Sequence, residues 1–408
     1  MKYGLIGEKL GHSFSKRIHE SLFGYEYEIK EISPKNLKLF LLERDFQGIN
    51  VTIPYKEVAL SYCDELDIST SKTGVLNTIV NHEGKLVGYN TDYYGLKFML
   101  EVKEIDITEK TVLILGSGGT CKTAFTLCKD LGAKEINICS RKEEEGFISY
   151  EDIEQQNFDV LINTTPVGMY PDNEGLPVVE TVLKEKVVID VVFNPLRTKL
   201  IQKALQQSCV ATGGLLMLVC QAAQAGALFV NEAKSASEIL DCYEKLNNDL
   251  ENIVFIGMPS SGKTSVAKEL ANALGKEFVD LDVLITETEG LSIPEIFEQF
   301  GEEYFRETER KVIEEVSKKQ GLVIATGGGA ILREENVNCL KQNGKLVLLE
   351  RGFDFIKVDE NRPLLKDKEQ WKNLYEERKE KYEAASDIIV KNDGIIEETV
   401  QRILEELT

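Results

Sequence analysis

Residues 257–264 read GMPSSGKT and carry the most specific chemical signal in the sequence. The pattern GxxxxGK[ST] stands directly after an apolar run, NIVFI, and directly before a helix-forming run, SVAKELANAL, which is the setting of a phosphate-binding loop. Glycines let the backbone N–H groups of such a loop wrap a phosphate chain, and the helix N-terminus adds a positive dipole. Lys263 supplies positive charge, and the hydroxyl of Thr264 is a ligand for Mg²⁺. We therefore expect ATP to bind at Gly257, Ser260, Ser261, Gly262, Lys263 and Thr264.

A second glycine-rich loop, GSGGTC at residues 116–121, follows the apolar run TVLIL and precedes another helix-forming run. This setting is typical of a dinucleotide-binding turn, although Cys121 holds the third fingerprint position, where glycine is usual. About twenty residues further on, an enzyme that uses NAD carries an acid for the ribose 2′-hydroxyl, whereas Arg141 and Lys142 here suit a 2′-phosphate. We therefore expect NADP(H) to bind at Gly116, Ser117, Gly118, Gly119, Thr120, Ser140, Arg141 and Lys142.

Several predicted loops of the first hundred residues carry polar or charged side chains. They are Ser13, Ser15, Asn50, Thr52, Lys56, Asn77 and Asp92. Hydroxyls, amides, one lysine and one carboxylate after strands are what a hydroxylated ring with a carboxylate requires of its site. Read singly, each is ordinary, since Asn50 can end a strand, Ser13 can belong to a turn, and Lys56 can be a surface lysine. Their order along the chain carries the inference.

Charged residues and glycines also follow the phosphate-binding loop. They are Asp280 and Asp282 in FVDLD, Arg306 in GEEYFRETE, Gly327, Gly328 and Gly329, and the later Arg362 and Arg378. A guanidinium presents a fixed fork of donors, which suits a carboxylate or a phosphate. Taken alone, Asp280 fits a strand-end cap, and Arg306 or Arg378 fits a solvated helical charge. Together they fit a binding site better than unrelated surface charges.

Short apolar and β-branched runs bounded by turn residues position these loops. They occur near residue 5 and at residues 49–54, 111–116, 136–140, 159–164 and 187–193. Runs of this kind are typical of buried strands, and helix-like stretches stand between them, for example after Lys122 and after Leu196. The alternation predicts βα units around parallel sheets, and hence an α/β fold.

The chain is too long for one ordinary core, so 408 residues predict two or three domains. Residues 235–251 read as an amphipathic polar helix that ends in a cluster of Asn and Asp, and a new strand begins directly afterwards. We expect a substrate-binding unit at residues 1–105, a Rossmann-like nucleotide-binding unit at 106–249, and a P-loop unit with a parallel sheet at 250–408.

The composition argues against some classes of function. A net charge of −21 disfavours nucleic acid, whose phosphates would need a basic face, and it requires each anion-binding site to carry its own Lys and Arg. No apolar run is long enough to span a bilayer, the N-terminus lacks the pattern of a secretory signal, and the eight cysteines are scattered. We expect a cytoplasmic protein that binds neither nucleic acid nor membrane.

The first part of the chain resembles shikimate dehydrogenase over residues 1 to about 245. The motifs that carry the resemblance are GHSFS (residues 11–15), NVTIPYKE (50–57), GVLNT (74–78), NTD (90–92), NTTPVGM (163–169), DVVFNP (190–195) and GGLLM (213–217). The resemblance implies that Ser13 and Ser15 bind the substrate carboxylate, that Asn50, Thr52, Asn77 and Asp92 orient the ring hydroxyls, and that Gln221 contacts the ring. Lys56 and Asp92 would form the catalytic pair, and Phe193 stands where a tyrosine is common.

The last part, residues 250–408, resembles shikimate kinase. By this resemblance Asp280 supports Mg²⁺, Asp282 binds the shikimate hydroxyls and accepts a proton, and Arg306 and Arg378 hold the substrate carboxylate. The three glycines allow close approach to the ring, and Arg362 belongs to a lid. The segment RGFDFIKVDEN before Arg362 is shorter than the lid of the family, and Lys357 is the one candidate for its adenine-side arginine.

The two resemblances imply NADPH-dependent reduction of 3-dehydroshikimate to shikimate, followed by phosphorylation of shikimate by Mg²⁺ and ATP. Reduction makes the substrate that the kinase consumes, so the fusion makes chemical sense. One alternative is a quinate or shikimate dehydrogenase that uses NAD, fused to a kinase for another small polyol. Another is a nucleotide-sensing module whose catalytic sites have decayed. The presence of all four expected catalytic residues argues against it: Lys56, Asp92, Lys263 and Asp282.

Overall fold

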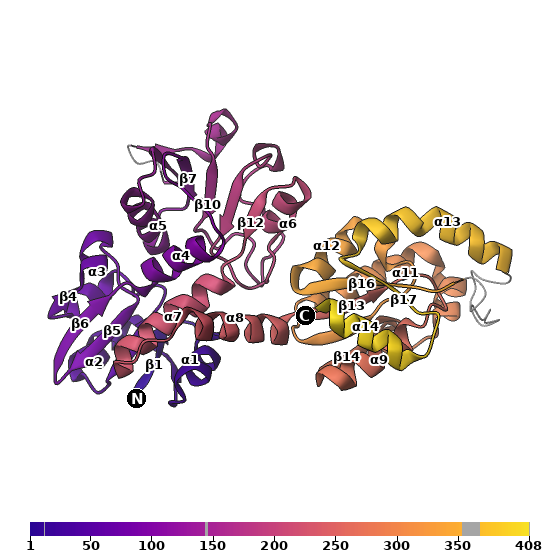
Figure 1. The fold of residues 1–408 in the computed structure, drawn as a ribbon, viewed down its shortest axis with the longest axis horizontal. Helices are drawn as coiled ribbons and strands as arrows, with labels where there is room; N and C mark the ends of the chain where they lie inside the picture. The colour runs from indigo at the N-terminus through magenta and orange to yellow at the C-terminus, as the bar shows by residue number, and fades with distance from the viewer. Residues whose placement is uncertain (12, 143–145, 353–367, 408) are drawn as a thin grey trace. The chain divides into compact units, whose positions relative to one another are not determined.

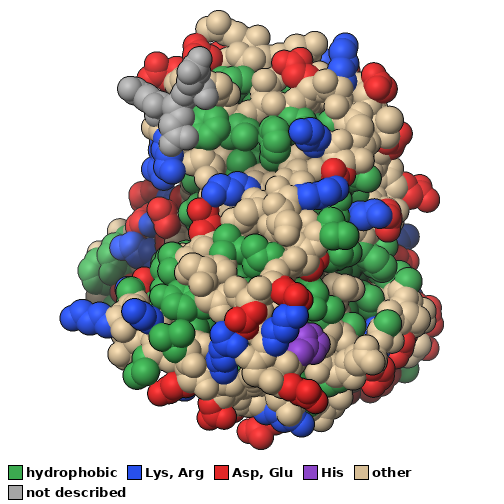
Figure 2. All heavy atoms as spheres, turned by 90° about the vertical axis from the view of Figure 1, so that its left-hand side faces the viewer, with side chains coloured by type: hydrophobic (Ala, Val, Ile, Leu, Met, Phe, Trp, Pro, Cys, Tyr) green, Lys and Arg blue, Asp and Glu red, His purple; other side chains and the backbone are tan. Residues whose placement is uncertain are grey.

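The computed structural model describes residues 1–11, 13–142, 146–352 and 368–407. The chain divides into two compact units, Met1–Asn247 and Asn248–Thr408. Strands and helices alternate in both, which confirms the expected α/β class (Figure 1). None of the helices in the described part of the chain is both long and apolar enough to cross a membrane. On the face drawn in Figure 2, Lys and Arg side chains lie among Asp and Glu, so the negative net charge does not make that face uniformly acidic.

The first lobe of the first unit has a six-stranded sheet in the order β2-β1-β3-β5-β6-β4. Its strands are β1 (Tyr3–Gly7), β2 (Glu28–Glu31), β3 (Gly48–Val51), β4 (Glu65–Leu66), β5 (Thr78–His82) and β6 (Lys85–Tyr89). Its helices are α1 (Ser15–Phe23), α2 (Pro34–Glu43), the 3₁₀ helix η1 (Val58–Tyr62), α3 (Ile68–Thr73) and α4 (Thr91–Val102).

The prediction of parallel sheets is wrong in part for this lobe. Strand β5 pairs antiparallel with both β3 and β6, whereas the pairs β1–β2, β1–β3 and β4–β6 are parallel. Glu83 and Gly84 join β5 to β6 as a two-residue turn, and both have positive φ, 52° and 94°. That is the geometry of a tight hairpin, and a connection of two residues can join only antiparallel strands.

The second lobe contains a parallel sheet in the order β12-β11-β10-β7-β8-β9. Its strands are β7 (Thr111–Leu115), β8 (Glu135–Cys139), β9 (Phe147–Ile148), β10 (Val160–Asn163), β11 (Val187–Asp190) and β12 (Val210–Thr212). Its helices are α5 (Gly119–Asp130), the 3₁₀ helices η2 (Tyr150–Gln155) and η3 (Glu180–Val182), α6 (Lys199–Gln206), α7 (Leu215–Val230) and α8 (Ala236–Leu250). The loops after β7, β8, β10 and β11 therefore share one edge, where ligands bind in such sheets.

Helices α4 and α7 join the two lobes and lie between their sheets (Figure 1). A Cβ on Gly95 would lie 2.7 Å from the carbonyl oxygen of Met217, so only glycine permits this close approach of the two helices. Leu96 of α4 and Met217 belong to the core beneath the second sheet. Phe229 of α7 stacks on Tyr3 of the first sheet, with ring centroids 5.5 Å apart. The shared helices thus fix the first lobe against the second.

The second unit has a five-stranded parallel sheet in the order β14-β15-β13-β16-β17. Its strands are β13 (Asn252–Ile256), β14 (Glu277–Asp280), β15 (Leu322–Ala325), β16 (Gly344–Glu350) and β17 (Ile388–Lys391). Its helices are α9 (Lys263–Leu274), α10 (Leu281–Glu289), α11 (Ile293–Ser317), the 3₁₀ helix η4 (Ala330–Leu332), α12 (Glu334–Asn343), α13 (Lys368–Ala385) and α14 (Ile396–Leu407). Helices α9 and α14 cover one face of the sheet, and α11, α12 and α13 pack over the other.

Candidate active sites

Lys56 and Asp92 form an ion pair in the first unit, with 2.6 Å between Nζ and Oδ2. Lys56 lies in the loop after β3, and Asp92 lies in the first turn of α4. Their side chains keep 18% and 13% of their exposure, so the pair is shielded from bulk water but still reachable by a small molecule. A lysine held by a carboxylate in this way can donate a proton to a nearby oxygen or place a positive charge beside it.

Asn77 connects this pair to Gln221 of α7. Its Nδ2 donates to Oδ1 of Asp92 at 2.9 Å and to Oε1 of Gln221 at 3.2 Å. Its Oδ1 accepts a hydrogen bond from the backbone N–H of Thr91 at 2.7 Å, so both ends of the amide are fixed. The structure therefore brings together Lys56 and Asn77 from two loops, Asp92 from α4 and Gln221 from α7.

Asn50 lies next to Asn77, because its Nδ2 donates to the carbonyl oxygen of Asn77 at 3.4 Å, and it is 5% exposed. Its Oδ1 accepts a hydrogen bond from the hydroxyl of Tyr27 at 2.6 Å, and its Nδ2 donates to Oγ1 of Thr78 at 3.0 Å. These bonds hold the strand end that carries Asn77. Thr52, two residues further, is half-buried at the end of β3.

Ser13 and Ser15 lie where the chain enters α1. The backbone N–H of Ser15 donates to Oγ of Ser13 at 3.2 Å. Between them, the ring of Phe14 lies 5.8 Å from the ring of Phe193, which follows β11 in the second lobe. The two phenyl rings, tilted by 57° to each other, therefore meet where the two lobes adjoin.

The glycine-rich loop at residues 116–121 joins β7 to α5 close to Lys56. Two features require glycine at position 116. Its φ is +107°, and a Cβ there would lie only 2.9 Å from Oγ1 of Thr164. Gly118 caps α5, and a Cβ on Gly119 would lie 3.8 Å from Cδ of Lys56. The loop thus lies beside the aliphatic stem of Lys56.

A cavity of about 640 Å³ lies against this loop. Ser117, which accepts a hydrogen bond from Oγ of Ser140 at 3.1 Å, is part of its wall. Four lysines and two carboxylates line it as well: Lys72, Lys122, Lys129, Lys142, Glu57 and Asp130. The excess of positive charge is what an anionic cofactor requires in a protein of negative net charge. Thr120 is half-buried in the first turn of α5, and Arg141 is exposed next to Lys142.

In the second unit, the phosphate-binding loop joins β13 to α9 as predicted from its sequence. Gly257 and Gly262 have φ of +140° and +94°. Lys263 is 7% exposed, and its Nζ donates to the carbonyl oxygens of Gly257 and Met258, both at 2.9 Å. Oγ1 of Thr264 donates to Oδ2 of Asp280 at 2.9 Å. This hydroxyl and carboxylate are hard oxygen ligands of the kind that Mg²⁺ prefers, so they fit the expected metal.

The glycines at 327–329 lie among the residues predicted to bind the phosphate acceptor, which are Asp282, Arg306 and Arg378. A Cβ on Gly327 would lie 2.8 Å from Oδ1 of Asp282, and one on Gly329 would clash with the guanidinium group of Arg306. Nη1 of Arg378 donates to the carbonyl oxygen of Gly328 at 3.1 Å. The glycines therefore let one carboxylate and two guanidinium groups converge on a single loop after β15.

Glu309 was missed by the sequence reasoning and lies in the middle of this cluster. It is 1% exposed, and its Oε2 lies 2.9 Å from Nη1 of Arg306. Burial raises the pKa of Glu309, and the positive charge of Arg306 opposes that shift. The spacing of three residues on α11 is the available sequence signal, because it places both side chains on one face of the helix.

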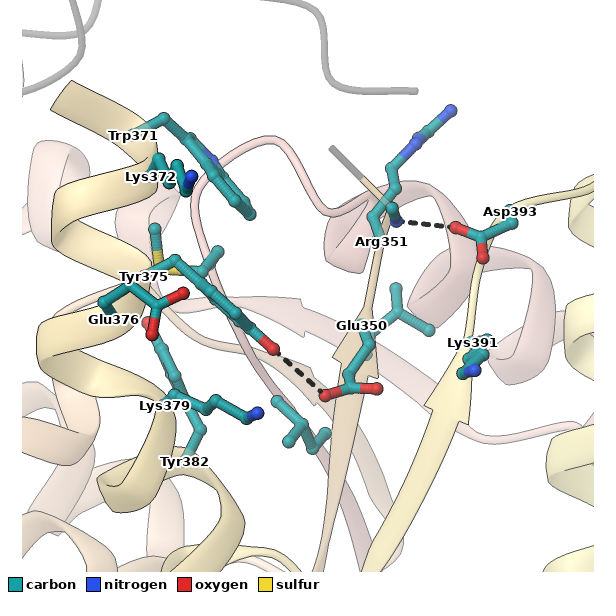
Figure 3. A pocket seen from close by; sticks show the side chains of 14 residues that line it. Glu350, Arg351, Trp371, Lys372, Tyr375, Glu376, Lys379, Tyr382, Lys391 and Asp393 are labelled. Carbon is teal, nitrogen blue, oxygen red and sulfur yellow. Dashed lines mark hydrogen bonds between the residues drawn. The ribbon is translucent and has the colours of Figure 1, made fainter. Parts of the chain in front are cut away.

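A second cavity, of about 460 Å³, lies between α13 and the ends of β16 and β17 (Figure 3). Trp371 and Tyr375 stack at 5.4 Å on its α13 side and face Arg351 and Asp393 on the strand side. Nε1 of Trp371 donates to the carbonyl oxygen of Pro259 at 3.1 Å, which ties this wall to the phosphate-binding loop. Arg362 and Lys357 lie outside the described residues.

Comparison with known proteins gives separate matches for the two parts of the chain. Residues 5–79 match the shikimate dehydrogenase substrate binding domain, and residues 259–408 match shikimate kinase. A shikimate dehydrogenase (NADP(+)) of Clostridium beijerinckii is 39% identical over 243 residues, which cover 55% of this chain and 89% of the relative.

Two solved structures extend the likeness of the first unit. A chorismate mutase/shikimate 5-dehydrogenase fusion protein from Clostridium acetobutylicum is 33% identical with a TM-score of 0.57, over 60% of this chain and 96% of that one. A shikimate 5-dehydrogenase from Thermus thermophilus, in complex with NADP(H) and shikimate, is 25% identical with a TM-score of 0.54, over 60% of this chain and 99% of that one.

Proposed function

The chain belongs to the shikimate dehydrogenase family and carries a shikimate kinase domain behind it, and from this we infer that it catalyses two successive reactions of the shikimate pathway. The first unit reduces 3-dehydroshikimate to shikimate with NADPH. The second unit phosphorylates shikimate to shikimate 3-phosphate with ATP and Mg²⁺. The observation that supports this most strongly is that each unit has its own nucleotide loop beside its own cluster of polar residues.

In the first unit, NADPH supplies the hydride. A carbonyl that receives hydride needs a proton at its oxygen, and Lys56 is the donor we assign, with Asp92 holding it at 2.6 Å. Asn77 and Gln221 bind ring hydroxyls beside that pair, and Ser13 and Ser15 bind the substrate carboxylate. Asn50 and Thr52 orient the ring hydroxyls as well, and Asn50 also holds the chain next to Asn77 through its bond to Thr78.

In the second unit, ATP supplies the phosphoryl group. Thr264 and Asp280 would hold Mg²⁺, and Lys263 would lie beside the phosphates. Asp282 orients the attacking hydroxyl and takes its proton, while Arg306 and Arg378 bind the substrate carboxylate with guanidinium forks. Glu309 holds Arg306 in place through their ion pair.

We also propose three domains, at residues 1–105, 106–249 and 250–408, although the contacts of the chain divide two residues earlier, after Asn247. The substrates of both units are small molecules. The eight cysteines are free thiols, which fits the reducing cytoplasm where we place the protein.

Reaction rates with alternative cofactors and alternative phosphate acceptors test these assignments. We expect oxidation of NADPH by 3-dehydroshikimate to be faster than oxidation of NADH, and formation of ADP with shikimate but not with gluconate or nucleosides. A preference for NADH together with quinate would favour the alternative dehydrogenase. Equal ADP formation with another polyol would reject the kinase assignment.

A further inference from the structure

We propose that Asn392 is a positioning residue for the phosphate-binding loop, and that it acts by holding the peptide group between Ser261 and Gly262. Asn392 directly follows β17, so it reaches the loop from a different part of the unit. This inference rests on the proposed function of the second unit, in which residues 257–264 bind ATP.

Both polar atoms of the Asn392 side chain, and its backbone N–H, form hydrogen bonds inside the protein. Its Nδ2 donates to the carbonyl oxygen of Ser261 at 2.8 Å, and its Oδ1 accepts from Oγ1 of Thr399 at 3.0 Å. Its backbone N–H donates to the carbonyl oxygen of Glu350 at 2.7 Å. Asn392 is 3% exposed and Thr399 is fully buried, so water does not compete for these bonds.

The bond from Asn392 fixes the direction of one backbone donor. The carbonyl of Ser261 and the N–H of Gly262 belong to the same planar trans peptide, so they point in opposite directions. Because Asn392 holds the carbonyl, the N–H of Gly262 must face away from β17. In a phosphate-binding loop such N–H groups are the donors to the phosphate chain.

Glycine at position 262 makes this support necessary. Gly262 has φ of +94°, and a Cβ there would lie 2.5 Å from Nδ2 of Asn392, so the loop and the amide are in direct contact. A peptide next to glycine reorients more easily than others because glycine occupies both halves of φ space. Without the amide of Asn392, the carbonyl of Ser261 loses the partner that keeps it outside the loop.

Other loop carbonyls are held by other side chains. Lys263 binds those of Gly257 and Met258, and Trp371 binds that of Pro259. In the described part of the chain, Asn392 donates the hydrogen bond to the carbonyl oxygen of Ser261. Removing Asn392 should therefore affect the nucleotide more than the acceptor substrate.

Calorimetric titration with MgADP and the steady-state KM values of the full chain test the proposal. Asn392→Ala is expected to raise the Kd for MgADP and the KM for ATP by about tenfold, the effect of losing one buried hydrogen bond together with the order it imposes. The KM for shikimate and the rate of NADPH-dependent reduction should remain those of the wild type. Thr399→Val, which frees the amide of Asn392 to rotate, should raise the same two constants by about threefold, and Thr399→Ser should restore them.

Wild-type MgADP affinity in Asn392→Ala would overturn the proposal. So would an equal rise in the KM for shikimate, because that would mean general loosening of the unit. Lys263→Ala serves as the reference for the nucleotide site itself. If it binds MgADP as tightly as the wild type, the nucleotide assignment fails together with the role of Asn392. If it loses binding while Asn392→Ala does not, only the role of Asn392 fails.

Discussion

Lys56 is the residue on which the assignment of the reduction depends. Lys56→Ala should lower the rate of NADPH oxidation by about two to four orders of magnitude, as expected for loss of a positioned acid, and leave ATP-dependent phosphorylation unchanged. Lys85→Ala is a matched control, because Lys85 also pairs with a carboxylate, Glu65 at 2.5 Å, but is 51% exposed in the same lobe. If the two variants reduce 3-dehydroshikimate equally well, the proton donor is a different group.

The preference for NADPH should depend on the basic residues after β8. Arg141→Ala and Lys142→Ala should each raise the KM for NADPH by about tenfold and leave the KM for NADH almost unchanged, because only NADPH has a 2′-phosphate. Arg141→Asp should favour NADH. Steady-state kinetics with both cofactors provides the check, and equal changes for NADPH and NADH would reject the assignment.

Ser260 occupies a backbone position that favours glycine. The N–H of Ser261 donates to the carbonyl oxygen of Met258 at 3.2 Å, so Pro259 and Ser260 are the central residues of a β-turn. Ser260 has φ of +66°, which identifies the turn as type II, whose second central residue is normally glycine.

Ser260→Gly should therefore raise the free energy of unfolding of the second unit by up to about 1 kcal/mol, because the left-handed conformation is strained for a residue with a Cβ. Ser260→Ala keeps the Cβ and should match the wild type. The fluorescence of Trp371, the one tryptophan of the chain, reports urea unfolding of this unit alone. If both variants stabilise the unit equally, the serine hydroxyl, and not the positive φ of residue 260, is what destabilises the wild type.

Motif residues such as Lys56, Asp92 and Thr264 could be predicted because their types and order along the chain specify the chemistry. Their partners could be predicted only in part. Asn392 reaches Ser261 across 131 residues, and nothing around either residue indicates the pairing. The bond between Asn77 and Gln221 spans 144 residues, and here only the family resemblance placed both in one site.

Asp190 ties together β10, β11 and α6. Its carboxylate accepts hydrogen bonds from Nδ2 of Asn163 at 2.9 Å, from the backbone N–H of Val192 at 3.0 Å and from Oγ1 of Thr198 at 2.6 Å. Burial raises the pKa of Asp190 from 3.8 to about 6, although these three donors oppose the shift. Because the folded state holds this proton more tightly than the unfolded state, the stabilisation is complete below pH 3.8 and is lost as the pH rises to about 6.

Asp190→Asn should remove this pH dependence, because the amide does not ionise. The wild type should lose up to about 3 kcal/mol of stability relative to the variant between about pH 4 and about pH 7. Denaturant titrations of the first unit, followed by circular dichroism at several pH values, provide the measurement. A constant difference between the two proteins across this range would mean that Asp190 does not titrate there.

Strands β7, β8, β10 and β11 of the second sheet and β13 of the third could be predicted, because a buried parallel strand is an uninterrupted apolar run such as TVLIL or NIVFI. The first sheet was predicted less well. Its direction of pairing depends on the turn at Glu83 and Gly84, whose positive φ values are a matter of backbone conformation rather than of apolar pattern. The kink of α11 at Gly301, with φ of +84°, likewise has no hydrophobic signature.

The two units should function separately if the chain is cut where their contacts divide it. Nζ of Lys276 donates to the carbonyl oxygens of Asn248 and Glu251 at 2.6 and 2.5 Å, and Leu250 is 6% exposed. The last turn of α8 therefore stabilises the second unit. We expect residues 1–247 to retain reduction and residues 248–408 to retain phosphorylation.

A shorter fragment, residues 252–408, provides the comparison. It lacks Leu250 and both acceptors of Lys276, and it should be less stable than residues 248–408 by about 2 kcal/mol. Urea unfolding followed through Trp371 gives both values. If the two fragments unfold at the same urea concentration, the end of α8 contributes nothing to this unit.

The central claim is that one chain performs both reactions in sequence, and ADP formation from 3-dehydroshikimate tests it directly. With ATP and Mg²⁺ present, the purified wild-type chain should form ADP from 3-dehydroshikimate only after NADPH is added. Lys56→Ala should form ADP from 3-dehydroshikimate and NADPH about two to four orders of magnitude more slowly than the wild type, but at the wild-type rate when shikimate is supplied. Lys263→Ala should oxidise NADPH and form no ADP with either substrate. ADP formation without NADPH, or no ADP formation from shikimate itself, would contradict the claim.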